Sequence, residues 1–202
     1  MNINSICVYC GSTPGRLLDY ALAAQGLGSE IGRRGIRLVY GGAGVGLMGE
    51  VARAALAAGG QVVGVMPQAL VAQEMASTEM IELRVVKDMH ERKAVMAELS
   101  DGFIALPGGF GTFEEFFEVL TWQQLGIHTK PCGLLNIKGY YDDLLKFLDH
   151  AVDEMFIHKP HNDMILASNE PVDLIEQFLH YVPVRMNKAH WVKEMSGQQN
   201  SD

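Results

Sequence analysis

The chain has 202 residues, of which 48% are hydrophobic and 20% are charged, and its formal net charge is −8. This balance is typical of a folded globular protein and excludes the low hydrophobicity and high charge of a disordered chain. A surface this acidic repels a phosphate backbone, which excludes long nucleic acids as partners, whereas a small anion can still bind to backbone N–H groups and one or two local cations.

Short β-rich runs alternate with helical patterns along the chain, the order typical of a parallel sheet with helices on both faces. Strands are predicted over 5–10, 36–40, 61–66, 81–86, 102–106, 132–137 and 164–167, and helices near 17–34, 46–58, 89–100, 112–125, 141–155 and 171–181. We therefore expect an α/β fold with a Rossmann-like, doubly wound parallel sheet. The whole of 1–185 should be a single domain, followed by a polar C-terminal tail over 186–202 that we expect to be mobile.

The first predicted strand carries the pair Cys7 and Cys10. A redox C-x-x-C lies at the start of a helix, and a zinc site needs a second pair of ligands at suitable spacing, so we expect these thiols to pack in the core and bind no metal. The N-terminus lacks the layout of a signal peptide, and no run of 18 apolar residues occurs, so we expect a cytoplasmic protein that does not bind membranes.

In doubly wound sheets ligands bind beyond the carboxyl ends of the strands, so the loops that follow strands are the candidate site. The first is Gly11-Ser12, and the second runs from Gly41 through Gly42 to Gly49. Within it, residues 44–49 fit the dinucleotide pattern G-x-G-x-x-G, but the next strand ends in V-M-P-Q, without the acidic residue that binds a ribose. These glycines therefore serve either for helix packing or as one wall of a mononucleotide pocket.

The stretch P-G-G-F-G-T, from Pro107 to Thr112, is the sharper signal, because its glycines lead directly from a strand into a helix predicted to begin near Thr112. Glycines allow close approach of a ligand, and the helix dipole and free first-turn N–H groups favour an anion. The Thr112 hydroxyl adds a further donor. No Gly-Lys-Ser or Gly-Lys-Thr follows, so the loop is not a P-loop for a triphosphate.

Glu115 lies three residues past Thr112, a spacing that fits a capping box. The same position also places a carboxylate one turn, about 5 Å, from a bound anion, which is roughly the length of one ribose. We expect its neighbour Glu114 to be solvated.

Arg92 shares a helical face with Met89, Met96 and Leu99, so its guanidinium should point inward. An inward arginine needs an anion, which is either a structural carboxylate or Glu115 together with a ligand. Lys93 reaches either a phosphate or the solvent.

The motif P-G-G-x-G-T-x-x-E is matched in full by residues 107–115, and with the pair Arg92-Lys93 it resembles the LONELY GUY (LOG) family of cytokinin riboside 5'-monophosphate phosphoribohydrolases, also described as lysine decarboxylase-like. The likeness runs from about Ile6 to Leu179. It implies a homodimer or larger assembly that hydrolyses N6-modified AMP, such as isopentenyl-AMP, or AMP itself, to free base and ribose 5-phosphate. It implies no metal and no organic cofactor.

The resemblance implies that Arg92 and Glu115 are the catalytic pair. Because positive charge gathers on the ribose as the glycosidic bond breaks, we expect Glu115 to stabilise an oxocarbenium ion and Arg92 to keep that carboxylate ionised. The expected substrate-binding residues are Ser12, Gly42, Glu74, Met89, Lys93, Gly108, Gly109, Phe110, Gly111, Thr112 and Thr121.

Two alternatives remain for the site. A non-catalytic nucleotide or cofactor carrier of the same fold is the main one, because a fold does not fix a function. A pyridoxal phosphate decarboxylase is disfavoured, because no lysine lies in a Schiff-base context. The stretch 69–80, rich in Met and small residues, either lines the base pocket or forms an ordinary surface loop.

Overall fold

The computed structural model describes residues 2–71 and 82–183; Glu74 and the predicted tail over 186–202 lie outside these ranges. The strands are β1 (Ser5–Tyr9), β2 (Arg37–Tyr40), β3 (Val62–Pro67), β4 (Glu82–Val86), β5 (Gly102–Ala105), β6 (Cys132–Leu135) and β7 (Ile165–Ser168). All pair in parallel in one seven-stranded sheet of order β4-β3-β2-β1-β5-β6-β7. The predicted doubly wound α/β sheet is confirmed.

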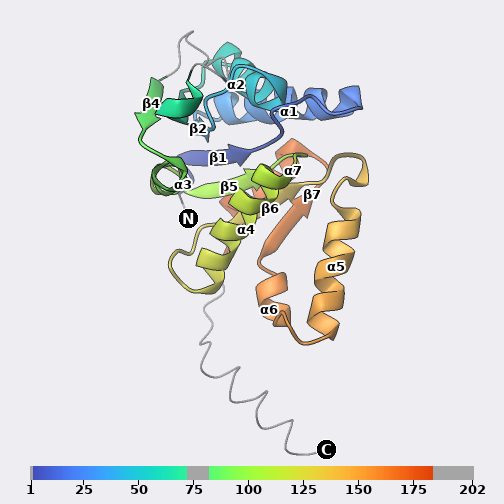
Figure 1. Cartoon of the computed structure of the whole chain (residues 1–202). Coiled ribbons are helices and arrows are strands. Elements are labelled where there is room, and N and C mark those ends of the chain that lie inside the picture. The colour runs from blue at the N-terminus through green and yellow to red at the C-terminus, as the bar shows by residue number, and fades with distance from the viewer. Residues whose placement is uncertain (1, 72–81, 184–202) are drawn as a thin grey trace, which may run out of the picture.

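Helices cover both faces of the sheet (Figure 1). One face carries α1 (Leu18–Arg33), α2 (Gly46–Ala57) and α7 (Pro171–Leu179), and the other carries α3 (Met89–Glu98), α4 (Phe110–Gln124) and α5 (Asp142–Asp153). Three short elements escape the sequence patterns: η1 (Gln68–Leu70), η2 (Ile137–Gly139) and α6 (Lys159–Asn162). Each has only three or four residues, too few to show a helical period.

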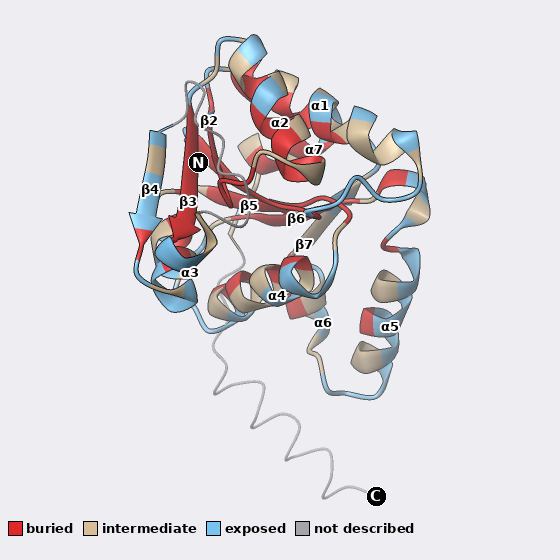
Figure 2. Ribbon diagram, turned by 45° about the horizontal axis from the view of Figure 1, so that its top comes forward, coloured by how far each residue is buried: buried red, intermediate tan, exposed pale blue. Residues whose placement is uncertain are grey.

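The inner strands of the sheet are buried on both sides, as Figure 2 shows for β3, β5 and β6, whereas the edge strands β4 and β7 are more exposed. This burial explains why the inner strands read as continuous apolar runs without alternation. The core forms two clusters, one on each face of the sheet. Cys7, Cys10 and Cys132 are buried and free, so the expectation that the thiols pack in the core is confirmed.

The chain order reverses at β1, which pairs with β2 on one side and with β5 on the other. The loops that leave β1 and β5 therefore diverge to opposite faces and open a crevice between them. They stay joined at its base, where the Gly11 N–H donates to the Pro107 carbonyl at 3.1 Å. Within the described ranges, no helix has the length and apolar character needed to cross a membrane.

Candidate active site

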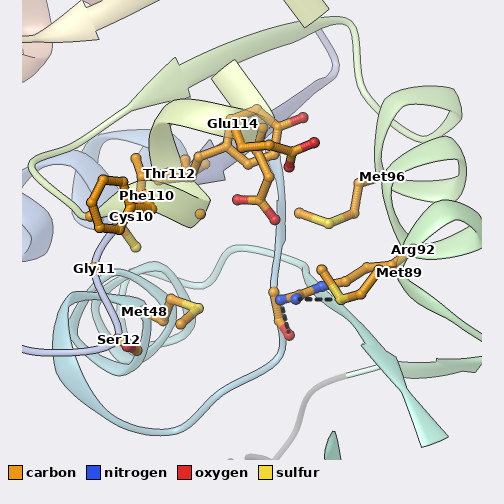
Figure 3. A pocket seen from close by; sticks show the side chains of 16 residues that line it. Cys10, Gly11, Ser12, Met48, Met89, Arg92, Met96, Phe110, Thr112 and Glu114 are labelled. Atoms are coloured by element: carbon orange, nitrogen blue, oxygen red, sulfur yellow. Dashed lines mark hydrogen bonds between the residues drawn. The ribbon is translucent and has the colours of Figure 1, made fainter. Parts of the chain in front are cut away.

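A cavity of about 290 Å³ opens at this switch point (Figure 3). Its walls come from the carboxyl ends of β1 and β2, one face of α3, and the first two turns of α4, with one side chain from α2. The side chains and backbone that line it are those of Val8, Tyr9, Cys10, Gly11, Ser12, Gly41, Met48, Met89, Arg92, Met96, Gly109, Phe110, Gly111, Thr112, Glu114 and Glu115. Segments far apart in the sequence thus meet around one hollow.

The helix α4 begins at Phe110, two residues before the predicted start, with Gly109 as its N-cap and no side-chain capping bond. The capping-box interpretation of Thr112 and Glu115 is therefore wrong, because Thr112 lies inside the first turn. Its buried side chain packs on Gly108, where an added Cβ would lie 2.0 Å from the threonine hydroxyl oxygen. The first N–H groups of α4 have no intrahelical acceptor and lie at the cavity, which is the geometry of an anion site.

Glu115 enters the cavity from the second turn of α4 and is largely buried. Burial raises the pKa of its carboxyl from 4.5 to about 7, while the positive charge of Arg92 acts in the opposite direction and Glu114 adds to the rise. Arg92 lowers this pKa, as its expected role requires, but the loss of solvent outweighs the attraction between the two charges. Near neutral pH this carboxyl exists in both protonation states.

Arg92 is 6% exposed, so its guanidinium points inward as the helical spacing predicts. Its partners are backbone carbonyls: Nε donates to Val65 O at 3.1 Å and Nη2 donates to Gly41 O at 3.0 Å. Nη1 lies 3.7 Å from the sulfur of Met89. A guanidinium has five N–H donors, so two of them have no acceptor among the described residues and can bind a ligand. The ends of β2 and β3 thus fix the arginine before any ligand arrives.

Lys93 is not among the lining residues of the cavity and forms ion pairs with α4, at 2.5 Å to Glu114 and 3.0 Å to Glu118. Its side chain is 12% exposed. The solvent alternative is therefore wrong, whereas the phosphate contact stays a prediction. Glu114 is not simply solvated either, because it is paired with Lys93 and lines the cavity.

Of the other predicted substrate-binding residues, some line the cavity and some do not. Ser12, Met89 and Phe110 line it, as do Gly109, Gly111 and Thr112. Gly42, Gly108 and Thr121 are not among its lining residues, and the Thr121 hydroxyl donates to Phe117 O within α4. Glu74 lies outside the described residues.

The cavity also contains Cys10 and Met48, which the sequence does not single out as site residues. Cys10 directly follows β1, so its position at a strand end was a usable signal, whereas nothing in the spacing of Met48 separates it from a core residue. Over residues 2–71 and 82–183, no cluster of three or more His, Cys, Asp or Glu side chains is placed to hold a metal ion.

Comparisons of the sequence with known proteins agree on one family. Residues 48–178 match the profile of a family described as "possible lysine decarboxylase". A cytokinin riboside 5'-monophosphate phosphoribohydrolase of Arabidopsis thaliana is 47% identical over 195 residues, covering 95% of this chain and 92% of its own length. The enzyme of the same name from Oryza sativa subsp. japonica is 51% identical over 178 residues, covering 88% of this chain and 74% of its own.

Among solved structures, the molybdenum cofactor binding protein of Rippkaea orientalis superposes with a TM-score of 0.65 at 25% identity, over 87% of this chain and 95% of that protein. The molybdenum cofactor carrier protein of Chlamydomonas reinhardtii gives 0.66 at 22% identity, over 89% and 100%. The second likeness is one of fold alone.

Proposed function

Since this chain belongs to the LOG family of cytokinin riboside 5'-monophosphate phosphoribohydrolases, and is therefore a nucleotide phosphoribohydrolase, we propose that its cavity hydrolyses the N-glycosidic bond of adenosine-type nucleoside 5'-monophosphates. The substrates are N6-modified AMP, such as isopentenyl-AMP, and AMP itself. The products are the free base and ribose 5-phosphate.

One observation carries this proposal: Glu115 and Arg92, from different helices, line the same small cavity as the open start of α4. The 5'-phosphate binds at the N–H groups of Phe110, Gly111 and Thr112. The ribose then reaches the second turn of α4, where Glu115 lies about 5 Å further along the helix axis.

The chemistry follows from the charge that appears on the sugar. As the glycosidic bond breaks, positive charge gathers on the ribose ring, and the ionised form of Glu115 stabilises this oxocarbenium-like state and orients the attacking water. The water adds a hydroxyl group to the anomeric carbon, and a proton leaves with the free base. Arg92, held by two carbonyls, binds ribose oxygens through its remaining donors and fixes the sugar beside that carboxylate. Ser12 and Met89 complete the substrate contacts.

The site also supports a proposal about assembly. Phe110 is 93% exposed at the edge of the cavity, and Leu125 at the other end of α4 is 51% exposed. Apolar side chains this open are typical of surfaces that a partner covers. We therefore propose a homodimer or larger homo-oligomer whose interface borders the cavity, in the cytoplasm, where buried free thiols stay reduced.

The test is incubation of the purified protein with AMP and, separately, with isopentenyl-AMP, followed by chromatography for free adenine or isopentenyladenine. Release of base and of ribose 5-phosphate in equal amounts is the expected result. Binding of either nucleotide without release would instead support the carrier alternative, the function that the names of the structural neighbours describe.

A further inference from the structure

The loop that leads from β5 into α4 has a donor on each of its carbonyl oxygens. The Leu106 carbonyl accepts from the Tyr141 hydroxyl at 2.6 Å, and the Pro107 carbonyl accepts from the Gly11 N–H at 3.1 Å. The Gly108 carbonyl accepts from the Tyr140 hydroxyl at 2.5 Å, and the Gly109 carbonyl accepts from the Phe113 N–H at 3.1 Å. Two of the four donors are neighbouring tyrosines next to the start of α5. Neither tyrosine lines the cavity of Arg92 and Glu115.

This pairing matters because a carbonyl oxygen repels a phosphate, whereas an N–H group attracts it. Gly108 and Gly109 follow one another, and glycines have wide conformational freedom, so the peptide unit between them can rotate at low cost. A rotation that turned the Gly108 oxygen toward the cavity would place negative charge beside the ligand and withdraw the Gly109 N–H. The Tyr140 hydroxyl opposes that rotation by binding the oxygen on the other side.

The two tyrosines are themselves held firmly. The side chain of Asn136, at the end of β6, accepts from the Tyr141 N–H at 2.7 Å and donates to Asp142 at 2.7 Å, which fixes the start of α5 against the sheet. The Tyr141 ring is 1% exposed. The Tyr140 ring packs edge-on against Tyr141 and Tyr20, with centroids 5.0 and 5.8 Å apart. Both hydroxyls are therefore fixed before a ligand binds.

We propose that Tyr140 and Tyr141 are positioning residues of the phosphate site, whose hydroxyls hold the carbonyls of Gly108 and Leu106 toward α5 so that a bound phosphate meets only N–H groups. They act through the loop, since neither side chain lines the cavity of Arg92 and Glu115. The inference rests on the proposed function in one respect, namely that the ligand presents a phosphate to the start of α4.

The test separates ligands with and without a phosphate. Dissociation constants for AMP and for adenosine are measured by titration calorimetry in the wild type and in Tyr140→Phe, which removes only a hydroxyl from a ring that is 38% exposed. Loss of one such hydrogen bond corresponds to AMP binding about three- to tenfold more weakly, with adenosine unchanged. Tyr141→Phe should act in the same direction. Tyr20→Phe, which keeps the ring contact to Tyr140, is the matched control and should change neither constant.

The outcomes are distinct from those of the hydrolysis assay. Unchanged AMP affinity in both tyrosine variants would overturn the inference, and so would equal weakening of AMP and adenosine, because a general loss of structure affects both ligands. A wild type that binds AMP no better than adenosine would also overturn it. A wild type that binds AMP and releases no base ends the hydrolase proposal, yet the comparison of AMP with adenosine still decides the role of the tyrosines.

Discussion

Two glycine-rich loops leave neighbouring parts of the sheet and enter helices, and they differ in how closely the protein packs around their glycines. At the start of α2, a Cβ on Gly46 would lie 2.4 Å from Ser12 O, and one on Gly49 would lie 2.3 Å from Gly44 O. At the start of α4, a Cβ on the N-cap Gly109 or on Gly111 would meet nothing within 4 Å. The first loop is filled by the protein itself, and the second faces open space.

The donors of the two helix starts differ in the same way. At α2 the Leu47 N–H, on the second residue of the helix, donates to Gly11 O. At α4 the second residue is Gly111, which lines the cavity. Of the two sequence-based interpretations of the G-x-G-x-x-G stretch, helix packing therefore fits better than a ligand wall for Gly46 and Gly49. A glycine pattern by itself does not distinguish a packing site from a ligand site.

The largest expected effect tests the carboxylates just inside each helix. Glu115→Gln should lower base release by a factor on the order of a hundred or more while AMP still binds, because the amide cannot carry the charge that stabilises the transition state. Glu50→Gln is the matched control: this residue follows Gly49 in α2, but its side chain pairs with Arg53 and Gln25. Initial rates and calorimetric titrations check both variants. Near-normal turnover in Glu115→Gln would refute its catalytic role.

The glycines themselves give the next largest effect. Gly49→Ala forces a methyl group against backbone and should lower the free energy of unfolding by about 2 kcal/mol. Gly111→Ala should leave stability unchanged or raise it by roughly 0.5 kcal/mol, since alanine favours the helix, while AMP binding weakens about tenfold because the methyl group enters the cavity. Urea unfolding and AMP titration measure the two quantities. If both variants were less stable and bound AMP as well as the wild type, the distinction between a packing glycine and a ligand-site glycine would be wrong.

Much of this fold could be predicted from the sequence, because its inner strands are apolar on both faces and the strands are separated by helices with clear periods. The burial of Arg92 was also predictable from its spacing to Met96, which is 1% exposed. These features depend on the spacing of apolar residues within one strand or helix, which can be read directly from the sequence.

The interactions around the site were not predictable, because they join segments far apart in the chain. Arg92 binds Gly41 O and Val65 O, 51 and 27 residues away, and a carbonyl leaves no mark in a sequence. Tyr140 reaches Gly108 across 32 residues for the same reason. The pKa of Glu115 depends on the depth of its burial, which spacing along one helix does not reveal.

That burial predicts a pH dependence of stability. The pKa of Glu115 rises from 4.5 when exposed to about 7 in the fold, so the folded state favours the protonated carboxyl. Stability should therefore fall as pH rises from 4.5 to 7, by on the order of 2 kcal/mol, and then stay level. Glu115→Gln lacks this penalty, so it should be more stable than the wild type at pH 8 and equal to it near pH 4.5. Denaturant unfolding at both pH values checks this, and parallel curves for the two proteins would contradict it.

The smallest expected effect concerns Lys93, which links the helix of Arg92 to the helix of Glu115. The family resemblance implies a substrate contact, whereas the ion pairs with Glu114 and Glu118 place its ammonium group on α4. Lys93→Met should therefore lower the free energy of unfolding by about 1 kcal/mol and base release only severalfold, with AMP affinity nearly unchanged.

The matched control is Lys146→Met, whose ion pair with Asp143 is exposed and far from the cavity, and which should change neither quantity. A salt series sharpens the distinction, because a brace between helices and a phosphate contact respond differently to screening. If Lys93→Met raises the dissociation constant of AMP tenfold while Glu118→Gln leaves it unchanged, the lysine leaves α4 to bind the nucleotide. The side of the cavity formed by α3 would then take its final arrangement only when the nucleotide binds.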